Sequence, residues 1–95
     1  MDKSVFTPYY GVLKQKVRSL RQAAKVTQRE LARRLKWGQT MVARVEQGER
    51  RLDLVEFIWL CKALGVDAKK AVNDVVEECL ALGRAARRKT RPTRR

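Results

Sequence analysis

A stretch from residue 39 to residue 47 carries side chains of the types that contact the edges of DNA bases. As a helix, it would turn Val42 and Val45 towards the protein interior. Glutamine forms two hydrogen bonds with adenine, arginine bonds guanine, and alanine or threonine can touch the methyl group of thymine. The residues predicted to contact bases from the outward face are Gln39, Thr40, Ala43 and Arg44. The alternatives are contacts to phosphate only, or a solvated face without function.

Other kinds of chemistry lack the residues that they need. The chain contains no histidine, the residue used most often as a general base and as a metal ligand. Its two cysteines, Cys61 and Cys79, cannot form a zinc site alone. Both lie in apolar patterns, which predict buried, reduced thiols rather than a disulfide. The sequence therefore argues against an enzyme, and we expect no metal site and no cofactor.

Charge is distributed unevenly along the 95 residues, whose net charge is +13. Residues 14–51 carry twelve bases and three acids, residues 52–83 carry three bases and six acids, and residues 84–95 carry seven bases and no acid. A basic first half suits a polyanion, whereas the second half suits another kind of contact. Double-stranded DNA is therefore the first candidate partner. A membrane surface is the second, but no basic stretch also presents exposed aromatic residues.

Length and end composition limit the architecture further. A chain of 11.0 kDa builds one small domain. Its apolar runs are too short to span a membrane, and residues 1–4 lack the features of a signal peptide. We therefore expect a cytoplasmic protein without membrane contact.

Signals for helix starts and ends divide the chain into five helices and leave almost no strand signal, which predicts an all-α fold. The expected helices cover residues 8–24, 28–35, 39–47, 54–64 and 68–83. The residues expected to cap helix starts are Thr7, Thr27 (in a capping box with Glu30), Asp53 and Asp67. The third, fourth and fifth helices are expected to end at Gly48, Gly65 and Gly83. Residues 1–7 precede this domain of residues 8–83. Residues 84–95 contain no apolar residue except two alanines, so we expect a disordered basic arm there.

The second and third expected helices, joined by a break at residues 36–38, have the layout of a helix-turn-helix, which places its second helix in the major groove of DNA. The residues around this motif, about 27–47, fit a known pattern, namely Leu20, Arg21, Thr27, Gln28, Glu30, Leu31, Ala32, Leu35, Gln39, Thr40, Val42, Arg44, Val45, Glu46, Gly48 and Ala63 to Val66. In these residues the chain closely resembles the phage-repressor-type (Cro/cI-like, XRE) helix-turn-helix family. The resemblance implies a compact five-helix, lambda-repressor-like DNA-binding domain that is usually dimeric and regulates transcription.

The resemblance also assigns roles to single residues. Gln28 matches a residue that holds a DNA phosphate and braces the recognition helix. Arg21 and Glu46 match a structural pair that joins the first helix to the third; otherwise both would be surface residues. Lys36 stands where the family usually has glycine, so it must adopt a left-handed conformation or the turn must differ. The residues expected to contact the DNA backbone are Thr27, Gln28, Lys36, Arg50 and Arg51.

Apolar residues in the last two helices exceed what one small core needs. The inward face of the fourth helix is expected to hold Leu54, Phe57, Ile58, Cys61 and Leu64. Trp59 would point to the opposite side, and the apolar stripe of the fifth helix is wider than that of a one-sided amphipathic helix. The residues predicted to form a dimer interface are Val55, Trp59, Val75, Val76 and Leu80. Alternatively, the fifth helix simply covers the fourth and buries Trp59.

These observations predict a homodimeric, sequence-specific DNA-binding regulator that binds an inverted repeat. They favour a repressor over an activator. One alternative is an antitoxin that neutralises a partner toxin through its last two helices or its arm and regulates its own promoter. Another is a protein that coats nucleic acid without sequence preference.

Overall fold

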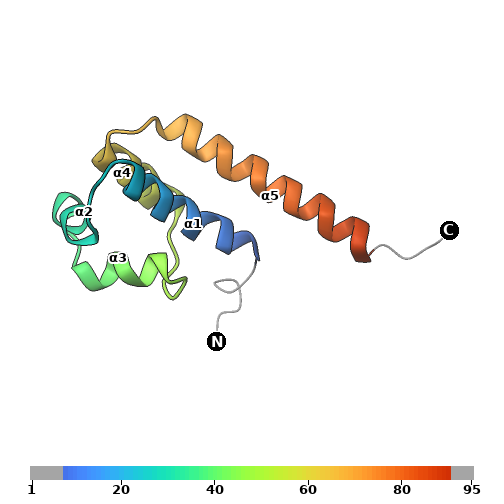
Figure 1. Ribbon diagram of the computed structural model, residues 1–95, viewed down its shortest axis with the longest axis horizontal. Helices are drawn as coiled ribbons and strands as arrows, with labels where there is room; N and C mark the ends of the chain where they lie inside the picture. Colours follow the sequence, from blue (N-terminus) through green and yellow to red (C-terminus); the bar gives the residue numbers. More distant parts are fainter. Residues whose placement is uncertain (1–7, 91–95) are drawn as a thin grey trace.

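The computed structural model describes residues 8–90, with side chains described up to residue 85, and these residues form five helices without strands. In chain order the helices are α1 (Pro8–Ala23), α2 (Gln28–Leu35), α3 (Gln39–Glu46), α4 (Leu54–Leu64) and α5 (Ala68–Thr90). The first four pack into one end of the molecule, while α5 runs along one side of them, above α1 in this view, and extends beyond them (Figure 1). The all-α fold and the five helices expected from the sequence are confirmed.

Capping interactions fix where the helices start. Asp53 accepts a hydrogen bond from the Glu56 amide, and the Glu56 carboxylate accepts one from the Asp53 amide, which completes a capping box at α4. At α2, Thr27 Oγ1 accepts from the Glu30 amide at 3.0 Å. The full capping box expected there was wrong in one half, because the Glu30 carboxylate instead bonds Arg33 and Arg34. Thr7, the expected cap of α1, lies outside the described residues.

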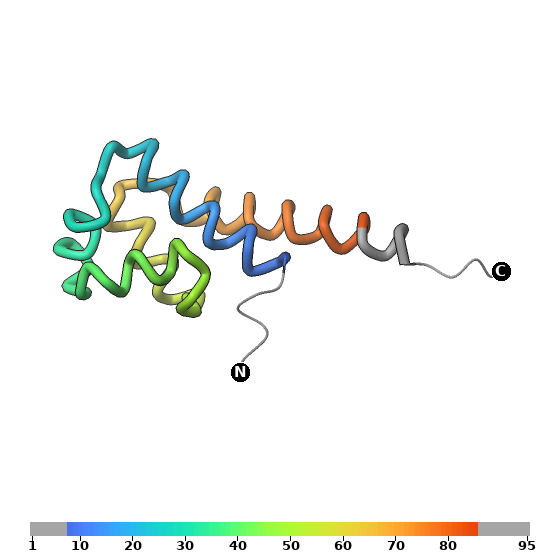
Figure 2. The backbone as a smooth tube through the Cα atoms, turned by 60° about the horizontal axis from the view of Figure 1, so that its bottom comes forward, coloured from blue at the N-terminus to red at the C-terminus, as the bar shows by residue number. Residues whose placement is uncertain are grey.

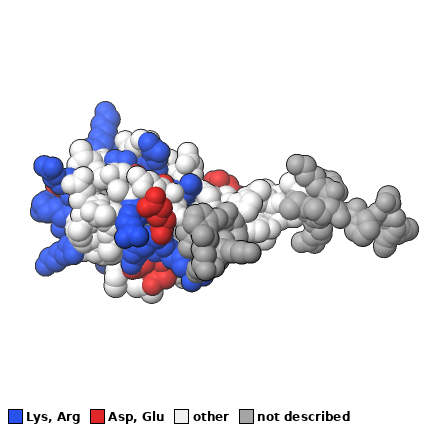
Figure 3. Space-filling view, turned by 90° about the horizontal axis from the view of Figure 1, so that it is seen from below, with Lys and Arg blue, Asp and Glu red and all other residues white. Residues whose placement is uncertain are grey.

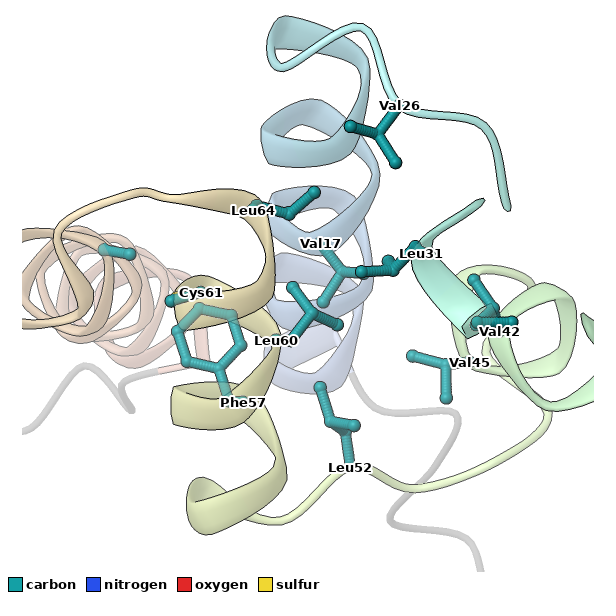
Figure 4. Packing of buried hydrophobic residues seen from close by; sticks show 12 residues of the cluster. Val17, Val26, Leu31, Val42, Val45, Leu52, Phe57, Leu60, Cys61 and Leu64 are labelled. Carbon is teal, nitrogen blue, oxygen red and sulfur yellow. The ribbon is translucent and has the colours of Figure 1, made fainter. Parts of the chain in front are cut away.

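The core lies where the first four helices meet. Val17 of α1, Leu31 of α2 and Leu60 of α4 converge, and Val42 and Val45 reach them from α3 (Figure 4). All five side chains are at most 2% exposed. Burying an aliphatic side chain of this size contributes about 1.5–3 kcal/mol to stability. The inward face of α3 is therefore fixed by packing, as the spacing of its valines predicted.

The buried face of α4 differs in part from the expected one. Phe57, Cys61 and Leu64 are buried as expected, but Leu54 and Ile58 are 61% and 36% exposed. Leu60 takes the central core position instead. Because α4 is apolar around almost its whole circumference, its pattern could not select one face.

Helix α5 runs through Gly83 and ends at Thr90, so the helix end predicted at Gly83 and the disordered arm predicted from residue 84 were wrong for residues 84–90. Residues 91–95 of that arm lie outside the described residues. A glycine inside a helix costs only about 1 kcal/mol, and the alanine and arginine residues that follow favour helix. Gly83 also lies next to the ring of Tyr9 in α1. A Cβ added to Gly83 would lie 3.3 Å from the Tyr9 hydroxyl.

Helix α5 packs along α1 and also touches α4 (Figure 2). Ala71 is buried at this contact, and Lys16 Nζ of α1 lies 2.9 Å from Asp74 Oδ2 of α5. Cys61 is buried as expected, whereas Cys79 is only partly buried, and its thiol lies 3.8 Å from the Tyr9 carbonyl oxygen. Within residues 8–90, no helix has both the length and the apolar character needed to cross a membrane.

Candidate nucleic-acid interface

The turn between α2 and α3 sets the direction of the second helix. Lys36 ends α2 with φ 59° and ψ 36°, which is the left-handed conformation and thus the first of the two possibilities that the sequence left open. The Trp37 amide donates to the Ala32 carbonyl at 2.9 Å and the Lys36 amide donates to the Arg33 carbonyl at 3.2 Å. This pair of bonds is a Schellman motif, a common helix end that usually contains glycine. The lysine occupies it at a cost of about 1–2 kcal/mol.

Helix α3 begins after this turn and presents its polar face to solvent. Gly38 precedes it in an extended conformation and gives no side-chain cap. Gln39, Thr40 and Arg44 are exposed, and Ala43 is half-buried beside them. The Arg44 guanidinium lies 3.9 Å from Glu49, and both side chains are more than half exposed, so this contact is weak. The four residues predicted to face DNA thus share one face of α3.

A buried ion pair holds α3 against α1. Arg21 Nε lies 2.6 Å from Glu46 Oε2, and Arg21 Nη2 lies 3.0 Å from Oε1; the two side chains are 12% and 3% exposed. The third guanidinium nitrogen of Arg21, Nη1, donates to the Val26 carbonyl at 2.9 Å. The expected pairing of these residues is confirmed. Its two parallel hydrogen bonds fix the distance and the rotation between the helices.

Gln28 extends this network to the first turn of α2. Its Nε2 donates to Glu46 Oε1 at 3.0 Å, so the side chain braces α3 as the resemblance implied. Its predicted contact with phosphate stays a prediction. The start of α2 provides backbone amides and the positive end of the helix dipole, both of which favour an anion. Arg29, exposed in the same turn, was not among the predicted contacts, although its charge and its place in the first turn pointed to it.

The side chain of Arg50 is engaged within the protein. Its Nη2 lies 3.0 Å from Glu56 Oε2, and its guanidinium lies over the Trp37 ring, 5.6 Å from the ring centre. The hydrogen bond from Arg50 lowers the pKa of the Glu56 carboxyl. Arg50 therefore connects the segment after α3 to α4 and to the α2–α3 turn, and a contact with phosphate would compete with this role. Arg51, beside it, is exposed.

Basic side chains surround the end of the molecule that contains α2 and α3, whereas acidic ones lie closer to the long helix (Figure 3). Among them, Arg33 and Arg34 bond Glu30 and lower the pKa of its carboxyl from 4.5 to about 2. Lys36 is exposed on the turn. This charge distribution favours the approach of a polyanion to the end that exposes α3.

The residues predicted to form a dimer interface lie on α4 and α5. Val55, Trp59, Val76 and Leu80 are 46–53% exposed, so α5 does not bury Trp59. Val75 instead lies partly buried against the core. Among the described residues, His, Cys, Asp and Glu side chains do not gather in any group of three that could hold a metal ion.

Comparison with known proteins agrees with this geometry. Residues 14–71 match a family described as "Helix-turn-helix domain". The structure is similar to that of an "XRE-family like protein" from Pseudomonas syringae pv. tomato, with a TM-score of 0.71 and 34% sequence identity, covering 80% of this chain and 93% of the other. It also shares its fold with the clp gene regulator ClgR from Corynebacterium glutamicum, with a TM-score of 0.69 at 24% identity over 90% of this chain and 89% of the other. No curated protein matches the sequence.

Proposed function

The chain belongs to the XRE-type helix-turn-helix family of DNA-binding regulators, and from this premise we propose that it represses transcription by binding an inverted-repeat operator as a homodimer. The observation that carries the proposal is the outward face of α3. Its exposed glutamine, threonine and arginine side chains lie opposite two buried valines, on a helix that the Arg21–Glu46 pair holds in place.

In this proposal α3 is the recognition helix and lies in the major groove. Gln39 and Arg44 form hydrogen bonds with base edges, while Thr40 and Ala43 contact thymine methyl groups or exclude water. Thr27, Gln28 and Lys36 contact the phosphates on either side and fix the register of α3, since backbone contacts orient a protein without reading sequence.

A dimer would place two copies of α3 in successive major grooves, about one helical turn of DNA apart, which is why an inverted repeat is expected. Repression would then be steric, because a protein bound across a promoter excludes the polymerase. The net charge of +13 would add affinity for any DNA sequence and make binding strongly dependent on salt.

Selection of bound sites from a random pool of duplex DNA tests this proposal. The expected result is a pair of inverted half-sites with centres about 10 base pairs apart, or a multiple of that spacing. Arg44→Ala should cost about 1–3 kcal/mol of binding to the selected site and relax preference at one position of each half-site. Selection without a consensus would contradict sequence-specific recognition and favour a protein that coats nucleic acid. An unchanged ratio of specific to random binding in Arg44→Ala would remove this residue as a base reader.

The antitoxin is a second candidate, and the exposed apolar residues on α4 favour it because a partner protein could cover them. It predicts a toxin encoded by a neighbouring gene. Co-expression should then abolish toxicity and give a stable complex, and substitutions on α4, rather than on α3, should prevent neutralisation. Toxicity unaffected by co-expression would contradict this candidate.

A further inference from the structure

Exposed apolar side chains follow one another along two turns of α4. Leu54 and Val55 lie one turn before Ile58 and Trp59, and each of the four is at least 36% exposed. Trp59, the largest, is 53% exposed. A contiguous apolar surface of this kind on a small domain marks an association site.

Beside these side chains, α4 and α5 form an apolar groove, to which Leu13 of α1 and Leu52 also contribute at one hollow. Two hollows of about 240 and 610 Å³ open between the helices, and both are lined by Leu54, Val72 and Val76, so they form one continuous groove. Phe57 lines the first hollow and Ile58 lines the second. The groove is therefore wide enough for a large side chain and almost entirely apolar between its ends.

The two ends of this groove carry opposite charges. Asp53 lines the first hollow and Lys69 lines the second, and both residues are exposed. A rotation of 180° about an axis through the middle of the groove exchanges its ends. In a pair of copies related by this rotation, Asp53 of each copy would face Lys69 of the other. The groove is thus complementary to itself in charge.

Charge also disfavours the basic part of the molecule as a contact between copies. Residues 14–51, which contain α2 and α3, carry twelve bases and three acids, so two such surfaces repel each other. Residues 52–83, which contain α4 and most of the described part of α5, carry three bases and six acids. Two copies therefore approach each other most readily through α4 and α5.

Building on the proposed homodimer, we propose that a second copy of this chain occupies the groove, and that Trp59 of each copy inserts between α4 and α5 of the other. A twofold interface requires a projection and a matching hollow on the same surface patch. Here the two are adjacent in sequence, because Ile58 lines the groove and the next residue, Trp59, is exposed and lines neither hollow. A tryptophan that fills a hollow is the type of residue that dominates interface energies.

The test uses the full chain, and in one version Trp37→Phe so that Trp59 is the only tryptophan. Sedimentation over a range of micromolar concentrations gives the dimer dissociation constant, and tryptophan emission gives the environment of Trp59. The expected result is a dimer whose Trp59 emission moves to shorter wavelength as the dimer fraction increases. Trp59→Ala should raise the dissociation constant about 30-fold or more.

Tyr9→Ala is the matched control, because it removes an aromatic side chain of similar exposure, 47% against 53%, that does not line the groove. It should change the dissociation constant by no more than about twofold. Lys69→Glu should weaken the dimer by placing two acids opposite each other. Adding Asp53→Asn should restore most of the affinity, since asparagine still caps α4.

Circular dichroism of each variant identifies loss of fold, in which case Trp59→Phe replaces Trp59→Ala. The insertion of Trp59 into the groove is contradicted if the dimer forms but Trp59 still emits like an exposed indole. It is also contradicted if Trp59→Ala dimerises as well as the wild type. Both results leave the proposed homodimer intact. A wild type that stays monomeric both alone and on operator DNA contradicts the homodimer as well.

Discussion

At the scale of single residues, the orientation of α3 depends on the buried carboxylate of Glu46. Within an otherwise basic half of the chain, this acid is 3% exposed in its side chain and accepts hydrogen bonds from both Arg21 and Gln28. Removing one partner of a buried pair leaves an uncompensated charge, which costs far more than the pair contributes when intact. The network therefore joins α1, the start of α2 and the end of α3, and fixes their relative positions.

Arg21→Ala is expected to lower the free energy of unfolding by about 3–5 kcal/mol, because it strands the Glu46 carboxylate in the interior. Thermal or urea unfolding followed by circular dichroism measures this change. The matched control is Arg33→Ala, which removes an arginine bonded to Glu30 at the surface, where the arginine side chain is 71% exposed. That substitution should cost less than about 1 kcal/mol. Equal effects of the two substitutions would show that the Arg21–Glu46 pair has no special structural role.

At the scale of elements, the α2–α3 turn tolerates a residue that its backbone does not favour. Lys36 adopts φ 59°, where a Cβ meets its own backbone. The hydrogen bonds of the Schellman motif and the packing of α2 on α3 hold it there. Lysine at this position adds a positive charge near the expected path of the DNA backbone. The left-handed backbone therefore lowers stability at a position where the charge is expected to favour binding of DNA.

Lys36→Gly should therefore raise the free energy of unfolding by about 0.5–1 kcal/mol, the relief of strain being partly offset by the greater freedom of glycine in the unfolded chain. Lys36→Ala is the control, since it keeps the Cβ and should give no gain. Both variants lose the same charge and should weaken DNA binding equally, with a smaller salt dependence. If Lys36→Ala raised the free energy of unfolding as much as Lys36→Gly, the cause would be the loss of the charge and not the relief of backbone strain.

The segment between α3 and α4 is held by a contact that depends on pH. The hydrogen bond from Arg50 lowers the pKa of Glu56 below its ordinary value of 4.5. A carboxyl whose pKa is lower in the folded state stabilises the fold above its unfolded pKa, and this contribution is lost as pH falls through the folded pKa. Glu30, bonded to Arg33 and Arg34, and Asp74, bonded to Lys16, act in the same direction.

The thermal midpoint of the wild type should therefore decrease as pH falls below about 4.5. Glu56→Gln should lower stability near neutral pH by about 0.5–1 kcal/mol, because the pair with Arg50 is only partly exposed. It should also make the midpoint decrease less steeply in acid. Thermal unfolding at pH values from 2 to 7 measures both effects. Parallel curves for the two proteins would exclude a contribution from the Arg50–Glu56 contact to acid sensitivity.

At the scale of the whole molecule, the chain separates two surfaces. The end with α2 and α3 is basic and exposes polar side chains, whereas α4 and α5 expose apolar ones. The molecule measures 54 Å along its longest axis, against 31 and 20 Å along the others, and α5 extends beyond the other four helices (Figure 1). Four basic residues after Gly83, namely Arg84, Arg87, Arg88 and Lys89, belong to the last turns of this helix.

Removal of residues 84–95, which contain seven bases, should weaken binding to operator and to random DNA by similar factors. The slope of the logarithm of affinity against the logarithm of salt concentration should decrease by about 0.9 for each phosphate contact that is lost. The truncation also removes the end of α5, which continues to Thr90. The control is therefore a full-length chain in which glutamine replaces the seven bases, because this variant loses the charges but keeps the helix. Loss of preference for the operator with an unchanged salt slope would show that this segment reads sequence.

Several features were determined by the sequence alone. Four of the five helices end within one residue of the expected position, because capping residues and left-handed glycines act locally. The outward face of α3 followed from two valines at a spacing of three, since this helix has one apolar side and one polar side. The pairing of Arg21 with Glu46 followed from resemblance to a known family. At Lys36 the resemblance left two possibilities, a left-handed conformation or a different turn, and the structure has the first.

Only the tertiary structure decided the remaining features. The pattern of α4 could not select its buried face, because that helix is apolar around almost its whole circumference and packs against α1, α2 and α5. Leu54 and Ile58 were therefore assigned to the wrong side. Helix α5 passes Gly83 because α1 packs against it there, a contact distant in sequence. The side chain of Arg50 is held by a carboxylate and an aromatic ring that the fold brings to it. Local signals determine where a helix begins and which residues alternate along it, whereas the choice among several apolar faces depends on what the rest of the chain places beside them.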